Sequence, residues 1–383
     1  MSETELLDRV RRRLAAQSVE PTPARIAAAV RAEGGSLPPA DGLSLLQRLQ
    51  DDLLGAGPLA PLLRDTAVTD VLVNAADEVW VDRGRGLEQA DICFADDDDV
   101  RRLVARLLVP TGRRLDDAQP WVDARLPDGT RLHAILTPIA SRGTCLSLRT
   151  LGRQHFTLAD LAAAGSASPI VVEVLEAVVR ARLSVLISGG TGTGKTTLLS
   201  CLLGLVDAGE RIVVVEDSAE LRPTCRHVVR LEARPPNVDG AGEVTLRDLV
   251  RQAMRMRPDR LVVGEVRGAE VAEMLAALNT GHEGGLSTVH ANTSRDVPAR
   301  LEALGSTAGM TRDALHAQAA AALDVIVHLR RARDGLRTVA EIGVVTRGAD
   351  GLVVVRGAVD RDGPAAGWPD LVELLGARDV HLP

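Results

Sequence analysis

The spacing of apolar residues divides the chain into segments of different character, and the first of these is helical. Leu6, Leu7, Val10 and Leu14 recur at the three- and four-residue intervals of one helix face. Prolines at positions 21 and 23 interrupt this pattern, and two further helical runs follow. We therefore expect residues 1–55 to form a helical N-terminal segment.

Residues 56–150 show short alternating runs, which is the period of a half-buried strand. An acidic stretch at 96–99 precedes an apolar pattern that predicts a helix over 99–108. Carboxylates at a helix start favour a capping role, and one contiguous run cannot easily surround a metal ion. We expect a small α/β domain, with strands at 70–73, 78–82, 131–136 and 145–149.

Strands and helices alternate from residue 169 to about residue 310, after a connector at 151–168. Such alternation predicts a parallel sheet, and we assign 169–383 to one domain. Thr245 and Asp248 form a capping signal for one helix. The expected strands are 183–188, 211–216, 261–264 and 286–290, and the expected helices are 170–180, 196–205, 245–255 and 269–278. Beyond residue 310 we expect a helix at 311–323, strands at 326–329 and 339–345, and a helix at 371–375. The pattern leaves open whether they complete this domain or pack on a neighbouring subunit.

A glycine-rich stretch after the first of these strands predicts a phosphate-binding loop. Residues 189–196 match G-x-x-x-x-G-K-[ST] in its required setting of strand, loop and helix. The glycines allow phosphate to approach the backbone, Lys195 is expected to reach the β- and γ-phosphates, and the Thr196 hydroxyl is expected to bind Mg²⁺. The sequence thus predicts ATP with Mg²⁺. The expected nucleotide-binding residues of the loop are Gly189, Gly190, Thr191, Gly192, Thr193, Gly194, Lys195, Thr196 and Thr197.

The amino-acid composition bears on whether the protein binds nucleic acid or crosses a membrane. The net charge of −7 argues against stable binding to nucleic acid, and aromatic residues at 1% leave little material for a base-stacking surface. No apolar run reaches about 18 residues, and the N-terminus lacks a signal-peptide pattern. We expect a cytoplasmic protein whose association with the membrane is peripheral.

Two strand ends supply carboxylates for hydrolysis of the nucleotide. The apolar run 213–215 ends in Glu216 and Asp217, and ligands bind at such strand ends in open α/β sheets. The run 261–263 ends in Gly264 and Glu265, which resembles a Walker B element with glycine in place of a metal-binding aspartate. We predict that Glu265 activates water and that Glu216 acts in catalysis and, with Thr196, at the metal.

Two histidines, His282 and His290, bracket the strand expected at 286–290. A metal site that includes Glu283 is conceivable, but the histidines lie eight residues apart without helical spacing. One histidine as a sensor of the γ-phosphate is the better interpretation. The predicted catalytic set comprises Glu265, Lys195, Glu216, His290 and His282.

These motifs in this order resemble the secretion-superfamily ATPases of type II and type IV secretion and pilus assembly. The stretches involved are the phosphate loop, 216–220, 257–267 and 280–292. Upstream stretches at 55–74 and 128–149 look like the N-terminal domain of the tight-adherence (Tad/Flp) pilus branch. The resemblance implies a RecA-like ATPase domain behind a smaller N-terminal domain, assembled as a homo-hexamer. It also implies that N-terminal arginines reach the phosphates, and Arg131 and Arg149 fall on matching positions.

Three functions compete on this basis. The first is a motor that hydrolyses ATP to push on an inner-membrane platform protein during pilus assembly or secretion, at the inner face of the membrane. The second is the ATPase of a conjugation or DNA-transfer system, which the acidic balance disfavours. The third is a nucleotide-gated scaffold with little turnover, and the presence of Glu265 argues against it.

Overall fold

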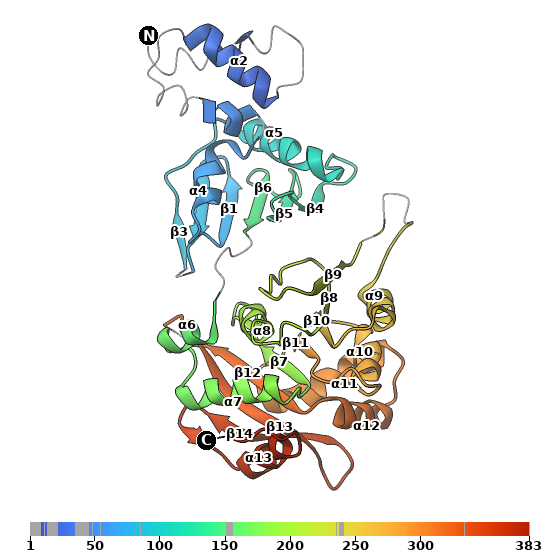
Figure 1. Cartoon of the computed structure of the whole chain (residues 1–383). Helices are drawn as coiled ribbons and strands as arrows, with labels where there is room; N and C mark the ends of the chain where they lie inside the picture. Colours follow the sequence, from blue (N-terminus) through green and yellow to red (C-terminus); the bar gives the residue numbers. More distant parts are fainter. Residues whose placement is uncertain are drawn as a thin grey trace. The chain divides into compact units, whose positions relative to one another are not determined.

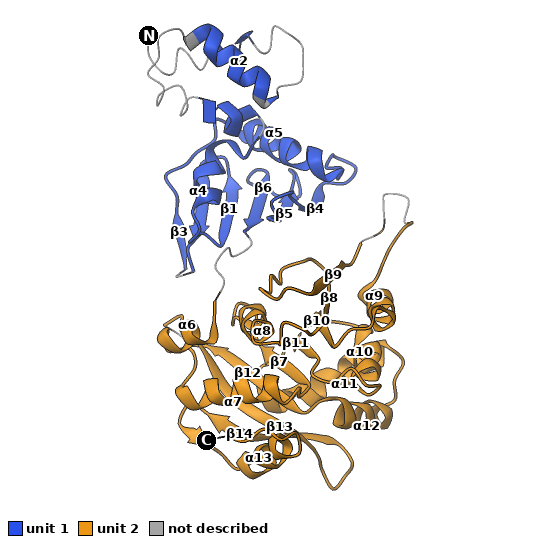
Figure 2. Ribbon diagram, viewed as in Figure 1, with its two compact units in different colours: residues 1–154 blue, residues 155–383 orange. Residues whose placement is uncertain are grey.

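The computed structural model describes residues 9–10, 12–13, 22–34, 46–47, 49–53, 55–84, 86–150, 156–234, 236, 241–332 and 334–382. The chain folds into two compact units, Met1–Gln154 and His155–Pro383 (Figure 2). The start of the predicted N-terminal segment, including Leu6 and Leu7, lies outside the described residues. Within the rest of that segment, α2 (Pro23–Gly34) is helical.

The first unit is built on an antiparallel sheet of six strands in the order β3-β2-β1-β6-β5-β4. Its helices are η1 (Gly57–Leu59), α4 (Ala60–Arg64), α5 (Asp97–Leu108) and η2 (Val109–Thr111), and its strands are β1 (Asp70–Ala75), β2 (Glu78–Asp82), β3 (Leu87–Gln89), β4 (Trp121–Arg125), β5 (Arg131–Ile135) and β6 (Cys145–Arg149). Alternate residues such as Leu146 and Leu148 share one core with the apolar side of α5. The expected capping role of the acidic stretch is confirmed, because the Asp96 carboxylate accepts the Asp99 backbone N–H at 2.8 Å.

The second unit is a nine-stranded sheet in the order β15-β14-β13-β12-β7-β11-β10-β8-β9, with helices on both faces (Figure 1). The strands from β12 to β9 in this order are parallel, and β13–β15 add antiparallel strands. One core lies under α6, α7, α8 and α13, and a second lies under α9–α12. The parallel sheet that alternation predicted is therefore present.

The bounds of these elements are as follows. The helices are α6 (Leu158–Ala163), α7 (Pro169–Arg180), α8 (Lys195–Leu203), α9 (Leu246–Ala253), η3 (Met254–Met256), α10 (Glu270–Leu278), η4 (Ser294–Asp296), α11 (Val297–Thr307), α12 (Arg312–Ala322) and α13 (Trp368–Gly376). The strands are β7 (Val185–Gly189), β8 (Ile212–Glu216), β9 (Val228–Glu232), β10 (Arg260–Val266), β11 (Leu286–Val289), β12 (Val325–Arg331), β13 (Arg337–Arg347), β14 (Val353–Asp360) and β15 (Gly363–Pro364).

Two of the additions to the predicted layout concern the extent of the second unit. Residues 156–168, expected within a connector, include α6, and buried Leu158 joins the core of the second unit. The C-terminal strands β12–β15 extend the sheet of the second unit, which answers the question that their pattern left open. The Thr245–Asp248 capping box that begins α9 is present as expected.

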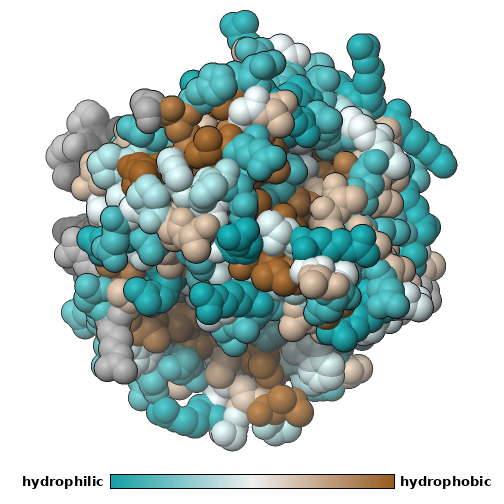
Figure 3. Space-filling view, turned by 90° about the horizontal axis from the view of Figure 1, so that it is seen from below, coloured by the Kyte–Doolittle hydropathy of each residue, from teal (hydrophilic) through white to brown (hydrophobic). Residues whose placement is uncertain are grey.

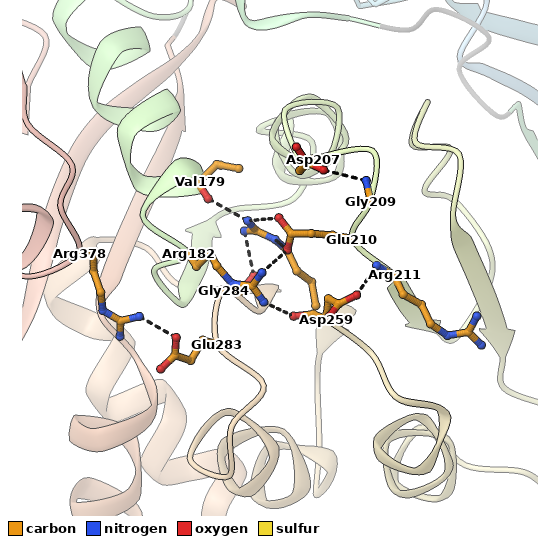
Figure 4. A network of polar contacts seen from close by, with 11 residues as sticks. Val179, Arg182, Asp207, Gly209, Glu210, Arg211, Asp259, Glu283, Gly284 and Arg378 are labelled. Carbon is orange, nitrogen blue, oxygen red and sulfur yellow. Dashed lines mark hydrogen bonds and ion pairs between the residues drawn. The ribbon is translucent and has the colours of Figure 1, made fainter.

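A buried ion pair holds together the strand ends opposite the phosphate loop. Arg260, 2% exposed, donates from Nε and Nη2 to the Glu210 carboxylate at 2.8 and 3.0 Å, and from Nη2 to the Val179 carbonyl at 2.9 Å. Arg182 donates to the same carboxylate at 2.8 Å (Figure 4). Arg260 of the 257–267 motif therefore joins β10 to the segment before β8 and to the end of α7.

Substitution of Arg260 by leucine is expected to lower the free energy of unfolding by about 3–5 kcal/mol, because it leaves the Glu210 carboxylate poorly compensated. Arg378→Ala is the matched control, since its 2.8 Å pair with Glu283 is exposed and such pairs contribute at most about 1 kcal/mol. Urea unfolding of both variants measures the difference. Equal losses would contradict the assigned role of Arg260.

No helix among the described residues is long and apolar enough to cross a membrane. On the face of the molecule shown in Figure 3, apolar side chains form small patches between hydrophilic ones.

Candidate active site

The loop between β7 and α8 has the backbone that a phosphate-binding loop requires. Gly192 and Gly194 adopt φ of +71° and +96°, a region that side chains disfavour. A Cβ atom on Gly189 would lie 2.7 Å from both the Leu329 carbonyl oxygen and the Thr193 hydroxyl. Each glycine is thus needed for the local fold. The remaining predicted loop residues follow in order: Gly190 and exposed Thr191 lie in the turn, and half-buried Thr196 and Thr197 lie in the first turn of α8.

Lys195 is the only lysine in the chain, and its side chain is buried in this loop at 8% exposure. Its ammonium group donates to the Gly189 and Gly190 carbonyls at 3.1 and 3.0 Å. Burial lowers the pKa of Lys195, and the negative charge of Glu265 opposes that shift. The ammonium group is therefore held at the mouth of the loop by backbone carbonyls.

Three of the predicted catalytic residues form one chain of contacts. Lys195 Nζ lies 3.2 Å from Nδ1 of His290, and His290 Nε2 lies 2.6 Å from Oε1 of Glu265. Arg267, to which the sequence analysis gave no role, donates from Nη2 to Oε2 of Glu265 at 2.6 Å. The signal for Arg267 was its position two residues after Glu265, which places both on one side of an extended segment.

The charges in this network follow from its contacts. The ammonium group of Lys195 can only donate, so Nδ1 of His290 accepts in this contact and the neutral ring carries its proton on Nε2. The contact between Nε2 and Glu265 is close but is not a hydrogen bond, because Oε1 has no hydrogen-bond partner among the described residues. Burial lowers the pKa of His290, which favours the neutral ring. Burial raises the pKa of Glu265, but the hydrogen bond and charge of Arg267 outweigh it and the net pKa is lowered. Glu265 is therefore an ionised carboxylate beside a neutral imidazole.

His282 does not join this network. It precedes β11, whereas His290 follows the same strand, so the two histidines lie at opposite ends of it. His282 Nδ1 lies 3.1 Å from the carbonyl oxygen of Ala277 near the end of α10. The place of His282 in the predicted catalytic set is corrected, because β11 delivers only His290 to the end of β7 that carries the loop.

Glu216 lies at the same edge of the sheet and explains the glycine at position 264. A Cβ atom on Gly264 would lie 2.7 Å from Cγ of Glu216, so any side chain there would collide with the neighbouring strand. Oε1 of Glu216 accepts the backbone N–H groups of Glu220 and Leu221 at 3.0 and 2.9 Å. The side chain of Glu216 on β8 therefore occupies the space beside position 264, where many Walker B elements carry an aspartate.

Comparison with known proteins shows the family of this chain. The family model described as "Type II/IV secretion system protein" matches residues 52–341. The chain belongs to this family. A putative conjugal transfer protein of Mycobacterium tuberculosis is 57% identical over 317 residues, covering 81% of this chain and 90% of that protein. The conjugal transfer protein TrbB of Rhizobium radiobacter is 30% identical over 298 residues, covering 76% and 88%.

Solved structures support the RecA-like secretion-ATPase fold. The pilus retraction motor PilT with bound ADP has a TM-score of 0.53 at 18% identity, and the ATPase DotB of Legionella pneumophila has 0.51 at 17%. Each alignment covers 84% of this chain and 85% of the other. These similarities concern the fold alone.

The secretion family implies Mg²⁺ with ATP, and the residues at this site fit such an ion. Oε2 of Glu216 is buried and has no hydrogen-bond partner among the residues that the structure describes. Carboxylate and hydroxyl oxygens, with phosphate, are ligands that Mg²⁺ accepts. Glu216 and Thr196 are therefore the residues that would hold the metal, which would neutralise charge on the phosphates.

Arginines of this secretion-family chain also line up on the sheet of the first unit. Arg131 on β5 and Arg149 on β6 are direct cross-strand partners. Arg125 on β4 pairs with Arg131 in turn, which extends the row to three. Adjacent positive charges repel, so an anion near this row would be favoured. The sequence analysis missed Arg125 because its alignment with Arg131 depends on strand pairing.

Burial of Glu216 makes the stability of the apo-protein depend on pH. Desolvation raises its pKa to about 7 from 4.5, although two backbone N–H groups oppose the shift. Because the folded state binds this proton more tightly than the unfolded state, the raised pKa contributes to stability, and the contribution is fully present below pH 4.5. This contribution of roughly 3 kcal/mol to the free energy of unfolding is lost as the pH rises from 4.5 through 7. In EDTA without nucleotide, Glu216→Gln and wild type should melt alike at pH 5, and the variant should melt higher at pH 8. A difference in Tm that stays constant with pH would contradict this assignment.

Proposed function

We propose that the chain binds ATP with Mg²⁺ at the 189–197 loop and hydrolyses it, with Glu265 orienting and polarising the attacking water. The contact chain from Lys195 through His290 to Glu265 is the observation that carries this proposal. It joins the group expected to meet the γ-phosphate to the group expected to act on water. His290 contacts both Lys195 and Glu265, so it is suited to report the presence of the γ-phosphate to Glu265.

Nucleotide binding has a direct test, because Lys195 is the only lysine. An acyl-phosphate derivative of ATP transfers its acyl group to a nearby amine and releases ATP. We expect acylation of Lys195, blocked by excess ATP or ADP, with the N-terminal amine as an internal control. Acylation of Lys195 that neither nucleotide blocks would contradict the proposed site.

We further propose that the hydrolysis powers pilus assembly or protein secretion by a homo-hexamer acting on an inner-membrane platform protein. Membership of the secretion family supports a motor of this class, and the motifs resemble the tight-adherence branch. The arginine row at Arg125, Arg131 and Arg149 would then reach the phosphates within the assembly. ATPase activity should rise with oligomerisation, and full activity in a strict monomer would refute this part.

DNA transfer is the second candidate, favoured by the relatives named as conjugal transfer proteins. A net charge of −7 weighs against it. DNA should stimulate the ATPase several-fold, with a steep dependence on salt, if this candidate is correct. Absence of any stimulation at low salt would favour the secretion or pilus motor.

A further inference from the structure

The hairpin between β12 and β13 brings two arginines to the phosphate loop from the side opposite Glu265. β12 pairs with β7 as far as Leu329 and Gly189, so its last two residues continue past the end of β7. Arg331 and Arg337 are cross-strand partners directly before and after the turn of this hairpin. They stand beside the loop because the strand order is β12-β7-β11-β10.

Both side chains reach the loop. Nε of Arg337 donates to the carbonyl oxygen of Gly192 at 2.9 Å, and Cδ of Arg337 lies 3.6 Å from where a Cβ atom of Gly194 would stand. Nη1 of Arg331 lies 3.9 Å from where a Cβ atom of Gly192 would stand. Two guanidinium groups therefore flank the segment that precedes Lys195.

The charge pattern calls for an anion. Two positive side chains on directly paired residues repel each other, and Arg331 forms no ion pair with any carboxylate in the described part of the chain. A guanidinium group has five N–H donors in a planar fork, which suits it to bind the oxygens of a phosphate group. Polyphosphate is the anion that a phosphate loop concentrates at this place.

We propose that Arg331 and Arg337 form a nucleotide-binding pair within the subunit, which contacts the part of the nucleotide that ADP and ATP share. This inference rests on the proposed nucleotide site and adds to it. His290 and Glu265 act from the β11–β10 side of β7, where the γ-phosphate and water are expected. The arginine pair lies on the β12–β13 side, so it faces the diphosphate and nucleoside portion.

The test is a comparison of ADP and ATP affinity in the full-length protein, with a fluorescent ADP analogue as the probe and unlabelled ADP and ATP as competitors. In Arg331→Gln/Arg337→Gln both dissociation constants should rise together, by about tenfold or more, because charge-assisted bonds to phosphate are lost. The kcat at saturating ATP should stay within about twofold while KM rises, since interactions made equally before and during reaction affect binding.

Arg347→Gln is the matched control. Arg347 lies at the other end of β13 and donates from Nε to the Gly351 carbonyl at 2.9 Å, the same kind of contact away from the phosphate loop. Arg337→Gln alone retains an amide donor for Gly192, so its loss of affinity measures charge. Arg337→Lys, which keeps the charge, should fall between Arg337→Gln and wild type.

Three results would overturn the inference. Unchanged affinities in the double variant would exclude the pair from the site, and a loss confined to ATP would place it at the γ-phosphate. A loss equal to that of Arg347→Gln would mean a general effect on the fold. Failure of wild type to bind either nucleotide would refute the proposed nucleotide site together with this inference, whereas normal binding by wild type and by the double variant would refute only the inference.

Discussion

Lys195→Ala is expected to reduce ATP hydrolysis by roughly a thousandfold or more, because it removes a preorganised charge from the γ-phosphate. The ammonium group is buried, held by the Gly189 and Gly190 carbonyls and in contact with His290. Its loss would also disconnect the loop from the Glu265 carboxylate. Release of phosphate from ATP by the purified variant measures the effect.

The control for Lys195→Ala is thermal unfolding without nucleotide. Replacement of a buried ammonium group whose pKa is lowered by desolvation should cost little stability, so the apo-variant should melt near wild type. Turnover within tenfold of wild type in a folded variant would contradict the assignment of the loop.

Glu265→Gln is expected to preserve nucleotide binding and to lower hydrolysis by about a hundred- to a thousandfold, because the amide can no longer polarise water as a carboxylate does. The amide is close to the carboxylate in shape, so Arg267 and His290 should keep their places. ADP affinity by fluorescence titration and single-turnover hydrolysis separate the two effects.

Glu232→Gln is a suitable control for Glu265→Gln. Glu232 is an exposed carboxylate at the end of β9, paired in register with Glu216 at the same edge of the sheet. Its replacement should leave hydrolysis within about twofold, in the range of surface changes. Comparable losses in both variants would remove the special role of Glu265, and loss of ADP binding in Glu265→Gln would indicate a binding residue.

The order of strands and helices around the phosphate loop was predictable because its signals are local. Short segments rich in apolar residues indicated β7, β8, β10 and β11, and the glycine pattern indicated the loop. The capping residues Asp96 and Thr245 marked helix starts through hydrogen bonds that span three residues. Short strands of mixed polarity such as β4 and β9 escaped detection, since strand formation there depends on the partner strand as well as on their own residues.

The meeting of Lys195, His290 and Glu265 was foreseen only as a set of candidates. Each residue lies at or beyond the carboxyl end of a parallel strand, and these ends share one edge of the sheet, so their proximity has a topological cause. Arg267 belonged to a recognised motif, but its hydrogen bond to Glu265 depends on the folded backbone. His282 was included with His290 in the predicted catalytic set, and the structure places it at the end of β11 that lies away from the phosphate loop.

The sequence by itself determined that this chain has a phosphate loop, a parallel sheet behind it and carboxylates where later strands end. Tertiary structure decided which groups meet there. Gly264 makes room for Glu216, and β12–β13 bring Arg331 and Arg337 to Gly192 from about 140 residues further along the chain. Local motifs fix their own backbone through turns and caps, whereas contacts between distant strands depend on sheet order and register, which no local stretch encodes.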